Sequence, residues 1–189
     1  MSYAIIRNEK YTKDEMIQLA PHNERFKKKY SNKNIDLSKT SQNYHLKLPK
    51  ENTYLKEYNR LIKENNLKNV HLVGFLSCEE TTKYYQAADI FVLPTRYDVW
   101  GLVINEALAN GLPVITTQNC IAGKELIKDD KNGYLVSADD EKELYLKINT
   151  LLLDEELRKH MCINALNSIK EYTIENMVKV HKNVIYKID

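Results

Sequence analysis

Between residues 70 and 136 the chain alternates short, wholly apolar runs with helical patterns, and this alternation limits the fold more than any other feature. The runs are VHLVGF (70–75), DIFVLP (89–94), PVITT (113–117) and GYLV (133–136). Strands that are apolar on both faces belong to a parallel sheet that helices cover on both sides. We therefore predict an α/β fold with a doubly wound parallel sheet.

Helical patterns fill the intervals between these runs, at residues 54–66, 78–89, 101–110 and 123–129. Three more helices are expected at 140–153, 155–170 and 174–186. Their predicted N-caps are Asp139, Asp154 and Thr173, because Asp and Thr side chains accept hydrogen bonds from the first free amides of a helix.

Charge divides the chain unevenly. Residues 1–70 hold 15 Lys and Arg against 8 Asp and Glu, whereas residues 71–189 hold 13 against 18. Such a switch favours two parts of different origin or role. We divide the chain into a basic segment, 1–53, and an α/β part, 54–189. In the basic segment YAIIR (3–7) is a candidate strand, but the rest is polar and is expected to pack poorly.

Membrane spans and disulfides are not expected. The first ten residues contain no apolar leader, and the longest apolar runs are far too short to cross a bilayer. Three widely spaced cysteines, Cys78, Cys120 and Cys162, favour a reducing cytoplasm over a disulfide framework or a zinc site.

The most informative stretch is PTRYDVWGLVINEALANGLPVITT, residues 94–117. Gly101 opens a helix without a side chain that could block a ligand. The amides of Gly101, Leu102 and Val103 would then point outward with the positive end of the helix dipole, which suits a diphosphate.

Two acids flank this helix start. Asp98 follows a strand at its carboxyl end, where ligands of open α/β sheets bind, and it could hold sugar hydroxyls. Glu106 could accept hydrogen bonds from a ribose diol, as the acid of dinucleotide-binding folds does. The plainer alternatives are that Asp98 is a helix N-cap and that Glu106 is an ordinary exposed acid. Trp100, Tyr84 and Tyr85 are interpreted as packing residues.

Residues 98–115 resemble the donor-binding C-terminal domain of retaining GT-B glycosyltransferases of group 1. They contain an acid, then an aromatic residue and a glycine, and after a gap of seven residues from the first acid a second acid that begins the run EALANGLPVI. That family includes many bacterial capsule and lipopolysaccharide enzymes. The resemblance extends over VHLVGFLS (70–77), AADIFVLPTR (87–96) and NGYLV (132–136). It implies an incomplete Rossmann-like domain, truncated at its beginning.

Site roles follow from this resemblance. It implies that Asp98, where the family usually has glutamate, is the catalytic acid that contacts the transferred sugar. Glu106 would bind the ribose, and Phe75 would lie in the loop that receives the base. The diphosphate would rest on the amides of the helix start, contributed by Trp100, Gly101, Leu102 and Val103.

The resemblance also implies a reaction. The intact parent would transfer a hexose from a nucleoside-diphosphate sugar, with retention, to a glycan or lipid-linked acceptor. No metal or other cofactor is expected, and the cytoplasmic enzyme could associate with the inner face of the membrane. The fragment itself is not expected to turn over, because half of the cleft is missing.

One departure concerns the sheet. The family's domain opens with two further strands, for which the sequence offers no recognised counterpart. In the strand order 3-2-1-4-5-6 those two strands lie between the third and the fourth. The runs at 70–75 and 89–94 are therefore expected to lack neighbours between them.

Residues 1–53 resemble a different family, the amino terminus of Mob/Pre-type plasmid mobilisation relaxases. The matching features are MSYAIIRNEK, HNER (22–25) and NYHLK (43–47). This resemblance implies a nucleophilic His22, a supporting Arg25 and a motif residue, Tyr44, and the basic charge agrees with DNA binding. The relaxases' metal-binding histidine cluster is missing. The alternatives to a transferase are thus a DNA-binding relaxase fragment and an inactive fusion of two reading frames.

Overall fold

Strands β4 (Ile90–Leu93), β5 (Val114–Thr117) and β6 (Gly133–Val136) lie parallel and adjacent. They belong to a computed structural model that describes residues 3–7, 44–48, 55–67, 70–72 and 76–186. All three strands lie within the apolar runs of the sequence. The predicted parallel sheet is therefore confirmed for this part of the chain.

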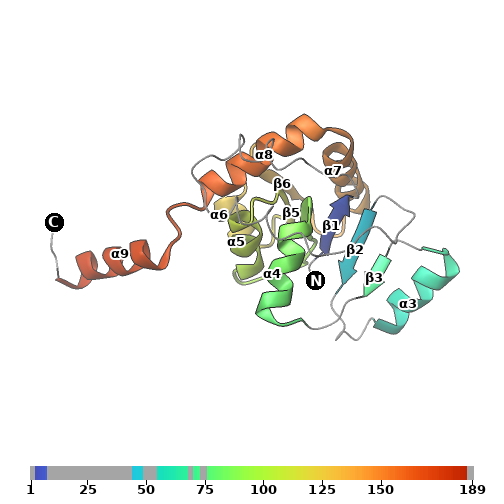
Figure 1. Cartoon of the computed structure of the whole chain (residues 1–189), viewed down its shortest axis with the longest axis horizontal. Coiled ribbons are helices and arrows are strands. Elements are labelled where there is room, and N and C mark those ends of the chain that lie inside the picture. The colour runs from blue at the N-terminus through green and yellow to red at the C-terminus, as the bar shows by residue number, and fades with distance from the viewer. Residues whose placement is uncertain (1–2, 8–43, 49–54, 68–69, 73–75, 187–189) are drawn as a thin grey trace.

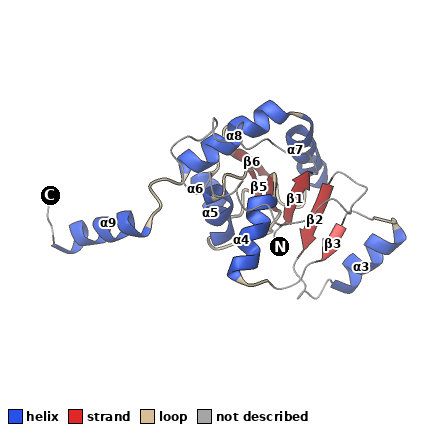
Figure 2. Ribbon diagram, in the orientation of Figure 1, coloured by secondary structure: helices blue, strands red, loops and turns tan. Residues whose placement is uncertain are grey.

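Helices cover both faces of these strands (Figure 2). Phe91 and Leu93 join a core with α4 (Cys78–Ala87), α5 (Leu102–Ala109) and α6 (Ile121–Leu126). Ile90 and Val92 join a second core with α7 (Glu141–Leu153). Because neighbouring side chains on a strand point to opposite faces, a fully apolar strand needs both cores.

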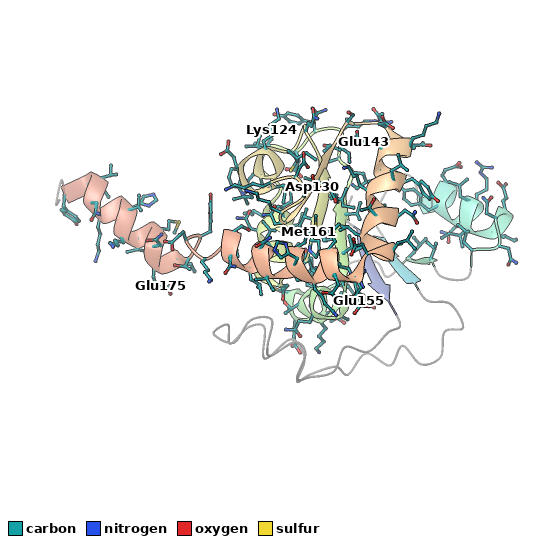
Figure 3. All side chains as sticks on the ribbon, turned by 90° about the horizontal axis from the view of Figure 1, so that it is seen from above. Lys124, Asp130, Glu143, Glu155, Met161 and Glu175 are labelled. Carbon is teal, nitrogen blue, oxygen red and sulfur yellow. The ribbon has the colours of Figure 1, made fainter. Side chains whose placement is uncertain are left out.

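Helix α8 (Glu155–Ser168) contributes to both cores. Its residue Met161 is fully buried in the core under α7, whereas Ala165 belongs to the core under α5. In Figure 3 Met161 lies over the body of the domain, while Glu155 marks the first residue of the helix. The helix therefore closes one side of the domain.

The sheet continues beyond β4 with strands from the N-terminal segment. Its order is β3-β2-β1-β4-β5-β6, with β1 (Tyr3–Arg7), β2 (Tyr44–Leu48) and β3 (Val70–Leu72). Strand β2 runs parallel to β3, whereas β1 is antiparallel to both β2 and β4. The predicted strand at 3–7 is confirmed.

These strands overturn the expected gap in the sheet. We expected β3 and β4 to have no neighbours between them, but β1 and β2 occupy that place (Figure 1). The backbone amides and carbonyls of a buried strand edge must find partners, and the two N-terminal strands supply them. Residues 44–48 therefore pair as a strand of the sheet, while the packing of their side chains lies outside the described part of the chain.

Two of the three predicted N-caps are confirmed. The Asp154 carboxylate accepts the Leu157 amide at 2.9 Å, and the Thr173 hydroxyl accepts the Asn176 amide at 3.1 Å. The third prediction, Asp139, is wrong because Asp140 caps α7 instead, through the Glu143 amide at 2.9 Å.

Two helices lie away from the two cores. Helix α3 (Leu55–Glu64) lies at the β3 end of the sheet, and α9 (Ile174–Tyr186) extends outward beyond α8 (Figure 1). Helix α9 buries none of its residues. Within the described parts of the chain, no helix is both long and apolar enough to cross a membrane.

Candidate functional site

The loop between β4 and α5 is tied to the segment that follows β5. The Asp98 amide donates to the Asn119 carbonyl at 3.2 Å, and the Ile121 amide donates to the Asp98 carbonyl at 3.4 Å. The Ala122 amide donates to the Trp100 carbonyl at 2.8 Å. These bonds fix the loop at the carboxyl ends of two adjacent parallel strands, the edge at which open α/β sheets bind ligands.

Gly101 is required at the start of α5 for two reasons. Its φ is +88°, in the left-handed region that L-residues with a side chain rarely adopt. A Cβ placed there would lie 2.6 Å from the Sγ of Cys120, well inside van der Waals contact. The backbone can pass this close to Cys120 only as glycine.

The amino end of α5 is open. Among the described residues, no side chain caps this helix, and the first intrahelical bond, from the Ile104 amide to the Gly101 carbonyl, measures 2.8 Å. The Leu102 and Val103 amides precede that bond and therefore cannot have partners within the helix. They lie at the positive end of the helix dipole, so this position favours an anion.

Asp98 lies beside this helix start, but it does not cap the helix. Its Oδ1 accepts the Trp100 amide at 3.1 Å, and its Cγ lies 3.7 Å from the point where a Cβ on Gly101 would stand. The alternative reading of Asp98 as the N-cap is therefore wrong, because Gly101 occupies that position. Asp98 is half-buried, and among the described residues nothing donates to its second carboxylate oxygen.

Glu106 lies five residues beyond Gly101, about 7.5 Å further along the helix axis. Its Oε2 accepts a hydrogen bond of 3.0 Å from the hydroxyl of Tyr85 on α4. Tyr85 is buried, as expected, but its hydroxyl makes a polar contact that the packing interpretation missed. Burial, followed by the charge of Glu106 and the hydrogen bond, raises the pKa of this phenol.

Trp100 and Cys120 fix the loop from the inside. The indole Nε1 of Trp100 donates to Asn105 Oδ1 at 3.1 Å, and the half-buried ring packs on the core. The Cys120 thiol donates to the Trp100 carbonyl at 3.2 Å. Burial raises the pKa of Cys120, which keeps the thiol protonated as a donor. Sequence reasoning missed Cys120 because nothing in its neighbourhood signals this contact.

Some predicted site residues cannot be placed. Phe75, His22 and Arg25 lie outside the described residues, and for Tyr44 only the backbone, in β2, is described. The structure thus places Asp98 beside the open helix start, and it pairs Glu106, further along the same helix, with Tyr85.

Comparison with known proteins identifies the family. The sequence profile described as "Glycosyl transferases group 1" matches residues 24–168. The chain belongs to this family.

Relatives of known sequence agree with this assignment. An uncharacterized glycosyltransferase from Methanocaldococcus jannaschii is 30% identical over 135 residues, which cover 71% of this chain and 38% of that protein. A probable sucrose-phosphate synthase from Thermosipho melanesiensis is 38% identical over 118 residues, covering 59% of this chain and 26% of the other. The chain therefore spans well under half the length of these relatives.

Solved structures share the fold. The C-terminal domain of a group 1 glycosyl transferase from Francisella tularensis has a TM-score of 0.61 and 30% identity, over 67% of this chain and 66% of that domain. The Anabaena protein HepE, solved with UDP, has a TM-score of 0.65 and 24% identity, over 71% of this chain and 37% of its own. The GT-B type of C-terminal domain is thereby confirmed.

The profile also bears on the N-terminal segment of this chain. It includes Arg25 and Tyr44, two residues on which the relaxase resemblance rested, and neither the relatives nor the structures named above support that resemblance. The division of the chain at residues 53 and 54 stays a prediction, although the family match runs across it.

Proposed function

We propose that the site binds a nucleoside-diphosphate sugar, and that the parent enzyme transfers the hexose with retention to a glycan or lipid-linked acceptor. The observation that carries this proposal is the open start of α5 behind Gly101, with Asp98 beside it and Glu106 further along the same helix. The diphosphate would accept hydrogen bonds from the Leu102 and Val103 amides. Asp98 would hold the transferred sugar, and Glu106 the ribose.

The chemistry follows from this placement. The bond between the anomeric carbon and the phosphate oxygen breaks, and that oxygen keeps the electron pair. The acceptor hydroxyl oxygen forms the new bond and gives up its proton to the leaving diphosphate. We assign the stabilisation of the leaving charge to the α5 amides and dipole rather than to a metal ion.

Two further observations support the proposal. The fold neighbour HepE has been solved with UDP and also with UDP-glucose. The three cysteines, Cys78, Cys120 and Cys162, are few and widely spaced in the sequence, which favours a reducing cytoplasm, where we place the donor and the reaction. The acceptor, and any contact with the inner face of the membrane, belong to the longer parent.

Titration calorimetry with UDP and with GDP tests the donor site. We expect one of the two to bind, and Glu106→Ala to weaken that binding by about tenfold, the loss of one hydrogen bond to a charged acceptor. Glu175→Ala is the matched control, because Glu175 is an exposed acid on helix α9, which extends outward beyond α8 and away from both cores. Equal binding by Glu106→Ala would remove Glu106 from the site. Binding of single-stranded DNA in place of either nucleotide would favour the relaxase alternative.

A further inference from the structure

Tyr85 is held rigidly in the core of the domain. Only 7% of it is exposed, and its ring meets Phe91 of β4 edge to face, with centroids 5.6 Å apart. Helix α4 is itself fixed at its start by Ser77 and Glu80, each of which caps the other's backbone amide. The phenol therefore has a defined position, with its hydroxyl at the margin of the core.

Glu106 has the opposite character. It is an exposed side chain on α5, and an unsupported glutamate in such a place samples several rotamers. The 3.0 Å bond from the Tyr85 hydroxyl holds its Oε2. Among the described residues nothing donates to Oε1, so one carboxylate oxygen is fixed and the other remains available.

We propose that Tyr85 is a positioning residue of the donor site, which orients Glu106 so that its free oxygen accepts hydrogen bonds from the ribose diol. This inference rests on the proposed function. The raised pKa of Tyr85 keeps its hydroxyl protonated, and hence a donor, throughout the neutral range. A carboxylate that is already oriented loses less conformational freedom when the nucleotide binds, which strengthens binding.

The role predicts a ribose-specific effect. A residue that only supports the fold would weaken the binding of every nucleotide. A residue that acts through Glu106 matters only for a nucleotide that carries the two hydroxyls. The comparison of a nucleoside diphosphate with its 2′,3′-dideoxy analogue separates these cases.

The experiment uses the full chain and whichever of UDP and GDP it binds more tightly. Tyr85→Phe removes one oxygen and keeps the ring against Phe91, and thermal melts check that the fold is retained. We expect this variant to bind the diphosphate about tenfold more weakly, while its affinity for the dideoxy analogue is unchanged. Tyr84→Phe, which deletes a hydroxyl one residue away on α4, should leave both affinities unchanged.

A double substitution gives a second measurement. In a Glu106→Ala background, which removes the acceptor of the Tyr85 hydroxyl, Tyr85→Phe should cause little further loss, because the two groups act as a pair. Additive losses would overturn the positioning role. The role would also be overturned if Tyr85→Phe weakened the binding of the diphosphate and of its dideoxy analogue equally. It would likewise be overturned if Tyr85→Phe preferred the diphosphate over the dideoxy analogue as strongly as the wild type does. If the wild type binds neither UDP nor GDP, the proposed function fails as well.

Discussion

At the scale of single residues, the site depends on one close approach of backbone to side chain. Gly101 has a φ of +88°, and the Sγ of Cys120 fills the space that a Cβ would need. The same thiol bonds to the Trp100 carbonyl, so Cys120 fixes the backbone on the amino side of Gly101. The open amides of α5 owe their position to this contact.

Gly101→Ala should therefore both destabilise the domain and weaken nucleotide binding. The left-handed conformation alone costs a side-chain-bearing residue about 1–2 kcal/mol, and the contact with Cys120 adds to that cost. Urea unfolding measures the loss. Leu102→Ala at the neighbouring exposed position should change stability by less than about 0.5 kcal/mol. An unfolding midpoint for Gly101→Ala equal to that of the wild type would contradict this reading.

At the scale of elements, α4 matters because it carries Tyr85 to Glu106. Its start is a capping box: the Glu80 amide donates to Ser77 Oγ at 3.3 Å, and the Ser77 amide donates to Glu80 Oε2 at 2.9 Å. This backbone bond, with the Ser77 hydroxyl, lowers the pKa of Glu80. The helix that positions the site is thus fixed by a local device readable in its sequence.

Ser77→Ala should cost about 1 kcal/mol of the free energy of unfolding, because the Glu80 amide loses its acceptor. The measurement is the urea midpoint at neutral pH. Ser137→Ala is a matched control: it removes an exposed serine hydroxyl, and the Ser137 amide keeps its 2.7 Å bond to Glu143. Equal destabilisation by the two substitutions would show that the capping box contributes nothing particular to α4.

At the scale of the whole molecule, each face of the sheet buries a tyrosine that resists ionisation. Tyr85 belongs to the core under α5, and Tyr134 to the core under α7, where Lys147 Nζ lies 4.1 Å from its ring centre. Burial, followed by the neighbouring Asp130, raises the pKa of Tyr134 to about 12. Both cores therefore favour the neutral phenol.

Stability should fall as the solution becomes alkaline. The folded chain holds the Tyr134 proton up to about pH 12, whereas the unfolded chain loses it near pH 10. The contribution of Tyr134 to the free energy of unfolding is therefore constant below pH 10 and declines between these values. By pH 11 the loss should be about 1 kcal/mol for this residue. Urea unfolding at pH 9 and pH 11 measures it. Tyr134→Phe should reduce the decline, whereas Tyr145→Phe, at an exposed site, should not. An unchanged decline in Tyr134→Phe would refute the assignment.

Local pattern alone predicted much of the domain. The strands at β4, β5 and β6 follow from apolar runs, because a strand buried on both faces has few polar positions. The spacing from Asp98 to Glu106 and the glycine between them indicated the helix start, because only glycine leaves those amides uncovered at a left-handed residue. Even so, sequence could not choose between Asp139 and Asp140 as the cap, since two adjacent aspartates have the same propensity. The structure gives Asp139 a φ of +62° and a 2.7 Å bond from Arg96 instead.

By itself, then, the sequence determined the parallel core strands, most of the helices and the glycine at the start of α5, since all of these depend on residues close together in the chain. Only the tertiary structure decided that β1 and β2 lie between β3 and β4, that Cys120 packs on Gly101 and that Tyr85 reaches Glu106. Those contacts join residues 19 to 89 positions apart in the chain. Their partners are selected by packing and by the need to pair buried polar groups, which no local pattern records.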